Sequence, residues 1–106
     1  MKKDVERRLR NEFIEAYTTA ERDYKFKSPI FIRMLNDHGA YETAKRLTDN
    51  PLWQSGYEKL AALGRTDLTV EHIILKPEYS IYFTDKQIHN AREKIKVASQ
   101  ILGHHY

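Results

Sequence analysis

Histidines and carboxylates are the side chains of this sequence that could do acid–base or metal chemistry, and their spacing argues against both. The five histidines are His38, His72, His89, His104 and His105. None belongs to an HExxH pair or to a carboxylate cluster with ligand spacing, so no metal site is expected. His72 follows Glu71, but helix neighbours point about 100° apart, which favours a surface histidine over an acid–base pair. The His104-His105 dipeptide could bind metal weakly, although a disordered tail is the expectation.

Nucleophiles and phosphate-binding loops are not predicted either. The sequence has no cysteine, and its four glycines are far apart, which excludes a thiol nucleophile and a glycine-rich phosphate loop. No serine-elbow pattern occurs. The carboxylates are expected to be spread over helix surfaces rather than gathered in one place. We therefore expect a protein that is not an enzyme and that uses no cofactor.

Basic and aromatic residues in the first half of the chain could bind nucleic acid or a protein partner. Residues 1–46 contain eleven Lys/Arg against eight Asp/Glu, whereas residues 47–106 contain seven of each. The candidate contacts in the first half are Arg7, Arg8 and Arg10 on the expected first helix, and Tyr24, Lys25 and Lys27 in DYKFKSPIF. Alternating rings and cations are typical of stacking platforms for single strands. The alternative is that the rings pack at the core while the lysines face water.

Two further residues are candidate contacts. Trp53 follows Pro51 and is expected to fill the core beside the helix that begins near Ser55. If Trp53 is exposed, it becomes a candidate anchor for a protein partner. Arg65 is expected to reach across a turn to Asp67, Glu71 or a helix C-terminus, and so to hold the angle between two helices. Without that role, Arg65 would be a partner contact.

Helical periodicity and helix-end signals place these residues on elements. A long first helix is predicted by the stripe of Val5, Leu9, Phe13, Tyr17, Ala20 and Tyr24. Ser28-Pro29 starts a second helix that Gly39 ends, and a third covers residues 41–47. A fourth covers residues 55–63, a short fifth follows the cap Thr69, and a capping box at residues 84–87 starts the last.

These elements predict an all-α fold, because no convincing strand pattern occurs. We expect a single compact domain of five or six helices over residues 1–103, with the first and last helices longest and residues 104–106 as a short tail. A chain of 106 residues with 41% apolar residues is enough for one core. No apolar run approaches the ~18 residues that a membrane span needs, and the charged N-terminus does not predict a secretory signal.

The stretch SGYEKLAALGRTDLTVEHIIL at residues 55–75 has the outline of a DNA-binding helix-turn-helix. Its second helix would begin with Glu71, which repels phosphates and has few base partners. Ile73 and Ile74 instead favour a helix that is buried on most sides. Leu68 and Ile73 have the spacing of a hydrophobic staple around the cap Thr69. The stretch is therefore interpreted as a structural turn.

The same stretch resembles a small, uncharacterised bacterial family of helical domains over about residues 24–96. The matching positions are Phe31, Met34, Gly39, Thr43, Ala44, Leu47, Ser55, Gly56, Tyr57, Leu60, Gly64, Arg65, Asp67, Leu68, Thr69, Val70, Glu71, Leu75, Pro77, Phe83, Thr84, Ala91 and Arg92. The chain departs from that pattern at Thr66 and Tyr82, where leucine is usual. The resemblance implies a helical fold and no particular activity, and it suggests a setting near mobile or defence-related genes.

Two functions remain open from the sequence. The leading hypothesis is a small, non-catalytic cytoplasmic protein that presents a helical surface to a macromolecular partner. An inhibitor or accessory factor in bacterial defence or phage counter-defence would be one form. The absence of cysteine fits a reducing compartment. The alternative is a nucleic-acid-binding module that uses the basic first helix and residues 24–27, for which a net charge of +3 is favourable.

Overall fold

The computed structural model describes residues 1–102 and confirms the all-α prediction, since no strand occurs within them. The predicted tail at residues 104–106, with His104 and His105, lies outside the described residues. The helices are α1 (Lys3–Tyr24), α2 (Pro29–Asp49), α3 (Ser55–Ala62), α4 (Val70–Ile74), α5 (Pro77–Ser80) and α6 (Asp85–Leu102), and a 3-10 turn, η1, spans Thr66–Leu68.

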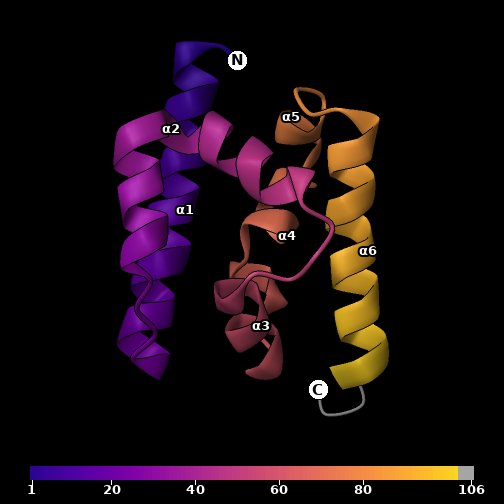
Figure 1. Ribbon diagram of the computed structural model, residues 1–106. Helices are drawn as coiled ribbons and strands as arrows, with labels where there is room; N and C mark the ends of the chain where they lie inside the picture. The colour runs from indigo at the N-terminus through magenta and orange to yellow at the C-terminus, as the bar shows by residue number, and fades with distance from the viewer. Residues whose placement is uncertain (103–106) are drawn as a thin grey trace.

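The helices pack around a main core and a smaller second cluster, and Figure 1 shows how they are arranged. The first half of α2 lies against α1 on one side of the molecule, and α6 forms the opposite side. The second half of α2 crosses from α1 to α6, while α3, α4 and α5 fill the space between the two sides. The main core therefore combines residues from almost every element: Val5, Leu9, Phe13, Ala16, Leu35, Ala40, Ala44, Val70, Ile73, Ile74, Tyr79, Phe83 and Ala91.

Gly39 bends α2 and allows it to change direction. Its φ of 81° lies in the left-handed region, as expected for a glycine that ends a helix. The helix resumes at once because Glu6 of α1 accepts hydrogen bonds from the N–H groups of Ala40 (2.8 Å) and Tyr41 (2.9 Å). The element α2 is therefore two helices that meet at Gly39, which matches the predicted second and third helices. Of the helices that run without such a break within residues 1–102, α1 with 22 residues and α6 with 18 are the longest, as predicted.

Local side-chain capping marks the starts of α2, α4 and α6, as the sequence predicts. The Ser28 hydroxyl accepts from the Phe31 N–H (3.4 Å), and the Thr69 hydroxyl accepts from the His72 N–H (3.2 Å). At the start of α6, the Gln87 N–H donates to the Thr84 hydroxyl and the Gln87 side chain accepts from the Thr84 N–H, which is a capping box.

The turn between α3 and α4 is structural, as predicted. Gly64 has a φ of 73° and ends α3 in the left-handed region. Leu68 packs against the main core, of which Ile73 is a member, which is consistent with the predicted staple. Ile74 is fully buried and α4 has only five residues, so this helix offers no exposed apolar or basic face for reading DNA.

Candidate functional site

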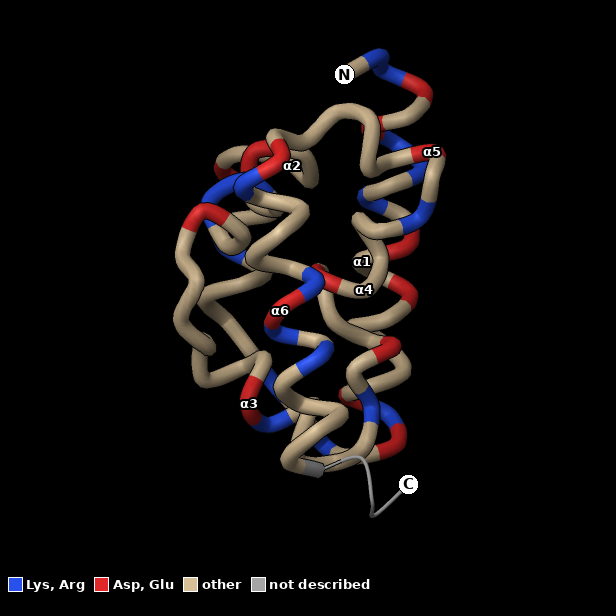
Figure 2. The backbone as a smooth tube through the Cα atoms, turned by 90° about the vertical axis from the view of Figure 1, so that its right-hand side faces the viewer, with Lys and Arg blue, Asp and Glu red and all other residues tan. Residues whose placement is uncertain are grey.

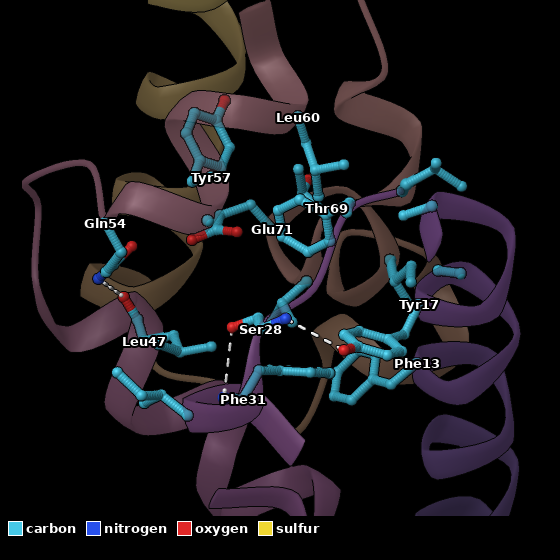
Figure 3. Close-up of a pocket in the computed structure, with 18 of the residues that line it drawn as sticks. Phe13, Tyr17, Ser28, Phe31, Leu47, Gln54, Tyr57, Leu60, Thr69 and Glu71 are labelled. Carbon is cyan, nitrogen blue, oxygen red and sulfur yellow. Dashed lines mark hydrogen bonds between the residues drawn. The ribbon is translucent and has the colours of Figure 1, made fainter. Parts of the chain in front are cut away.

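An apolar pocket of about 310 Å³ lies between α1, the first half of α2, α3 and α4 (Figure 3). A volume of this size is at the lower end of the range for ligand sites, roughly 300–1,000 Å³. Its lining is Phe13, Ala16, Tyr17, Ala20, Phe26, Ser28, Ile30, Phe31, Met34, Leu47, Gln54, Ser55, Gly56, Tyr57, Leu60, Leu68, Thr69, Val70, Glu71 and Ile73. The two walls therefore come from residues 13–34 and residues 47–73.

Aromatic rings form the wall that α1 and α2 provide. Phe31 packs edge-on against Phe13 with ring centroids 6.1 Å apart and stacks on Tyr17 at 6.2 Å. Phe26 packs edge-on against Tyr17 and lies next to Gly56 of α3. The Tyr17 hydroxyl accepts a hydrogen bond from the Ser28 N–H (3.0 Å), which fixes the loop between α1 and α2 across this wall.

A buried ion pair lies at the opposite, polar side of the pocket. Lys94 of α6 donates to Oε2 of Glu71 at 2.9 Å, and the two side chains are only 1% and 4% exposed. Lys94 also donates to the Leu47 carbonyl (3.1 Å) and to Oε1 of Gln54 (3.2 Å). Leu47 is in the last turn of α2, where the helix dipole favours a positive charge. The ammonium therefore has three acceptors and a helix C-terminus to offset its lost hydration.

The second oxygen of Glu71 has a different environment. Oε1 receives no hydrogen bond from any described residue, and Glu71 is one of the residues that line the pocket. Figure 3 shows its carboxylate on the side of Tyr57 and Gln54, across the pocket from Phe13 and Tyr17. The pocket thus offers an apolar volume with one charged acceptor at its end.

The mouth of the pocket is apolar and basic. Ile30 lines the pocket and is 71% exposed, so it lies at the opening. Residues 24–36, which contribute five lining residues to this edge, also include Lys25, Lys27 and Arg33, which do not line the pocket, and no acidic residue. All three cations are exposed, and none forms an ion pair within the described part of the chain. An acidic ligand would therefore be attracted to this edge.

The structure separates the three candidate arginines of α1. Arg7 and Arg8 are exposed, on a helix whose basic and acidic positions are interspersed (Figure 2). Arg10 is half-buried and donates to the Leu35 carbonyl (3.1 Å) and the Asn36 side chain (3.2 Å). Arg10 therefore ties α1 to the end of the first half of α2, whereas Arg7 and Arg8 are available to a partner.

Arg65 joins the turn to the end of α1, and the prediction that it reaches Asp67 is confirmed. Its Nε and one terminal nitrogen donate to the two oxygens of Asp67 at 3.0 and 3.1 Å. The other terminal nitrogen donates to the Tyr24 hydroxyl at 2.8 Å. The hydrogen bond from Arg65 lowers the pKa of the Asp67 carboxyl below its ordinary value. Tyr24 and Arg65, both predicted contacts, are thus bound to each other.

Trp53 is half-buried and packs edge-on against Tyr57 with ring centroids 5.1 Å apart. Together with Ile95 it contacts a second small cluster of Tyr57, Ala61 and Ala98. Trp53 thus lies beside the helix starting at Ser55, as predicted, but it is only partly buried and packs on this small cluster instead of the main core.

Sequence reasoning missed the Glu71–Lys94 pair. The expectation that carboxylates are spread over helix surfaces is wrong for Glu71, because Lys94 neutralises it inside the core. His72, its neighbour, is exposed as expected. The available signal was the position of Lys94, three residues after Ala91 and four before Ala98 on the apolar stripe of α6. Within residues 1–102, no three histidine, aspartate or glutamate side chains gather in a way that could hold a metal ion.

No family model matches this chain, and no curated protein and no solved structure matches it. The resemblance to the bacterial domain family stays a prediction. None of the helices in residues 1–102 combines the length and the apolar character that crossing a membrane requires.

Proposed function

We propose that the protein is a small, non-catalytic interaction protein that binds a macromolecular partner through the pocket between α1, α2, α3 and α4. The observation that supports this best is the pocket itself, because it opens at the surface beside the exposed Ile30. Protein interiors are normally close-packed, so an open apolar volume of about 310 Å³ forfeits contacts that an inserted group would restore.

The proposed setting rests on the sequence resemblance. Proteins of similar pattern suggest an inhibitor or accessory factor in bacterial defence or phage counter-defence, with the cytoplasm as the compartment. A compact helical domain fits such a role, because it can occlude a partner's surface without chemistry of its own.

Filling the pocket tests this proposal. Ala20 lines the pocket and is 1% exposed, so the ring of Ala20→Phe would occupy the space that a partner needs. Ala62→Phe is the matched control, because Ala62 is exposed at the end of α3 and does not line the pocket. Tagged wild-type protein and the control should recover the same partner from an extract of the host cell, and folded Ala20→Phe should not. Recovery by Ala20→Phe at the wild-type level would contradict the proposal.

A nucleic-acid-binding role is the second candidate. The side chains of Arg7, Arg8, Lys25 and Lys27 support it, because they are exposed and form no ion pair with any residue that the structure describes. Phe26 supports it less, since this ring packs against Tyr17 and Gly56 instead of offering a free stacking face. Affinity for single- or double-stranded nucleic acid should fall steeply with salt if this role is correct. Binding that persists in an Arg7→Gln/Arg8→Gln/Lys25→Gln/Lys27→Gln variant would exclude these residues as the contact.

A further inference from the structure

We infer that the group entering the pocket is a tryptophan side chain from a protein partner, in a segment with acidic residues on either side. This inference rests on the proposed function and deepens it by naming the chemistry of the contact. Three features favour such a group: the shape and lining of the pocket, the Glu71 oxygen that accepts no hydrogen bond from a described residue, and the basic stretch of chain that includes the exposed Ile30.

The lining selects a large aromatic group. Phe13, Tyr17 and Phe31 already form edge-on and stacked pairs with centroids 6.1–6.2 Å apart, and a further ring can add to them in the same geometries. Aliphatic residues complete the wall on the side of α3 and α4, among them Leu60, Val70 and Ile73. The volume of about 310 Å³ suits one large side chain rather than an extended ligand. Aromatic side chains that fill pockets of this kind are the usual anchors of protein interfaces.

The polar end selects a neutral hydrogen-bond donor. Oε2 of Glu71 is bound to Lys94, whereas Oε1 receives no hydrogen bond from the described residues. A carboxylate only accepts hydrogen bonds, and an indole N–H only donates them, so the two are complementary. A cationic group is disfavoured there because the Lys94 ammonium is already bound to the same carboxylate, 2.9 Å from its other oxygen. Phenylalanine would leave Oε1 desolvated without a donor, which is costly in an apolar site.

The mouth selects acidic neighbours and a peptide rather than a free small molecule. The exposed Ile30 extends the apolar surface beyond the pocket, and Lys25, Lys27 and Arg33 belong to the same stretch of chain and form no ion pair with any described residue. A free indole compound would fill the pocket and leave these groups unused. A chain segment with a tryptophan between aspartates or glutamates would contact all of them, and its affinity would weaken with salt because these contacts are exposed.

Fluorescence polarisation with labelled, capped hexapeptides tests the inference. The reference peptide has one central tryptophan and flanking aspartates. In the second peptide, 3-benzothienylalanine replaces tryptophan, so sulfur replaces the N–H without changing the ring shape. In the third, lysines replace the aspartates. We expect the second peptide to bind roughly 10- to 100-fold more weakly, as for a lost hydrogen bond to a charged group. The third should bind no better than the second, and Ala20→Phe should bind none of them.

Variants of the protein provide independent readings. Glu71→Gln should reduce the preference for tryptophan over benzothienylalanine, provided that its circular dichroism shows a folded protein. If it does not fold, the peptide comparison on the wild-type protein decides the point. The triple variant Lys25→Gln/Lys27→Gln/Arg33→Gln should bind the aspartate and the lysine peptide with affinities within about threefold of each other. Its affinity for the aspartate peptide should no longer depend on salt.

The outcomes separate this inference from the proposed function. Equal affinity for tryptophan and benzothienylalanine peptides, or for aspartate and lysine peptides, would overturn the inference. N-acetyltryptophanamide binding as tightly as the reference peptide would also overturn it, because the pocket would then be a small-molecule site. If no peptide binds but Ala20→Phe still loses its cellular partner, the tryptophan inference fails and the proposed function stands. If the peptides bind as expected and Ala20→Phe keeps its cellular partner, the proposed function fails instead.

Discussion

Lys94→Met tests how the buried ammonium contributes to stability. The substitution keeps the apolar stem of the side chain but removes the positive charge beside Glu71, which is 4% exposed. It also removes the donor of the Leu47 carbonyl and of the Gln54 side chain. Removing one partner of a buried ion pair typically costs about 3–5 kcal/mol, because the other charge stays buried without compensation. We expect about 4 kcal/mol, a large share of the roughly 5–15 kcal/mol that stabilises a typical domain.

The double variant Glu71→Leu/Lys94→Met separates the pair interaction from the loss of each group. Apolar replacements of similar volume often make the loss of a buried ion pair neutral or stabilising. The double variant should therefore be more stable than Lys94→Met alone, with a coupling energy of about 2 kcal/mol or more. The coupling energy is measured by urea unfolding, followed by circular dichroism, of the wild type, the two single variants and the double variant. Single costs that add to within roughly 0.5 kcal/mol would refute the reasoning.

Three other perturbations have definite expected outcomes. Glu6→Ala removes the acceptor of the Ala40 and Tyr41 N–H groups and should cost about 2 kcal/mol in urea unfolding, whereas Glu6→Gln should cost less. Lys25→Gly should raise stability by about 1 kcal/mol, because the φ of 57° at Lys25 is strained for a residue with a side chain; a lower thermal midpoint would contradict this. Acid should destabilise the fold, since the Arg65 hydrogen bond lowers the pKa of Asp67 from its ordinary 3.8. That contribution is present above pH 3.8 and lost as pH falls through the lowered pKa, so thermal midpoints of Asp67→Asn should depend less on pH there.

The helix ends were predictable because their signals are local. The hydroxyls of Ser28, Thr69 and Thr84 each accept from a backbone N–H three residues later, so the sequence around them contains the whole interaction. Gly64 is equally local, because it alone supplies the left-handed residue that ends α3. The periodic apolar stripe of α1 gave the buried positions Val5, Leu9 and Phe13 for the same reason.

The candidate site was not predictable in this way because its parts are distant in sequence. Glu71 and Lys94 are 23 positions apart, and although the place of Lys94 on the apolar stripe of α6 indicates a buried cation, nothing in the sequence indicates that Glu71 is its partner. A glutamate at the start of a short helix is typical of an exposed first turn, so the sequence around Glu71 does not indicate its burial. The pocket brings Tyr17 and Phe31 opposite Leu60, a juxtaposition that no spacing within a single helix encodes.

The cap that Glu6 provides makes the two ends of the fold dependent on each other. The helix from Ala40 to Asp49 begins on a carboxylate 34 residues earlier in the chain, so its first N–H group has this acceptor only while α1 is docked. Its far end is bound by α6, where Asn90 donates to the Thr48 carbonyl at 2.8 Å. Local opening of this segment would therefore require α1 and α6 to separate from it as well. We expect residues 40–49 to exchange their amide hydrogens only with the cooperative unfolding of the whole domain.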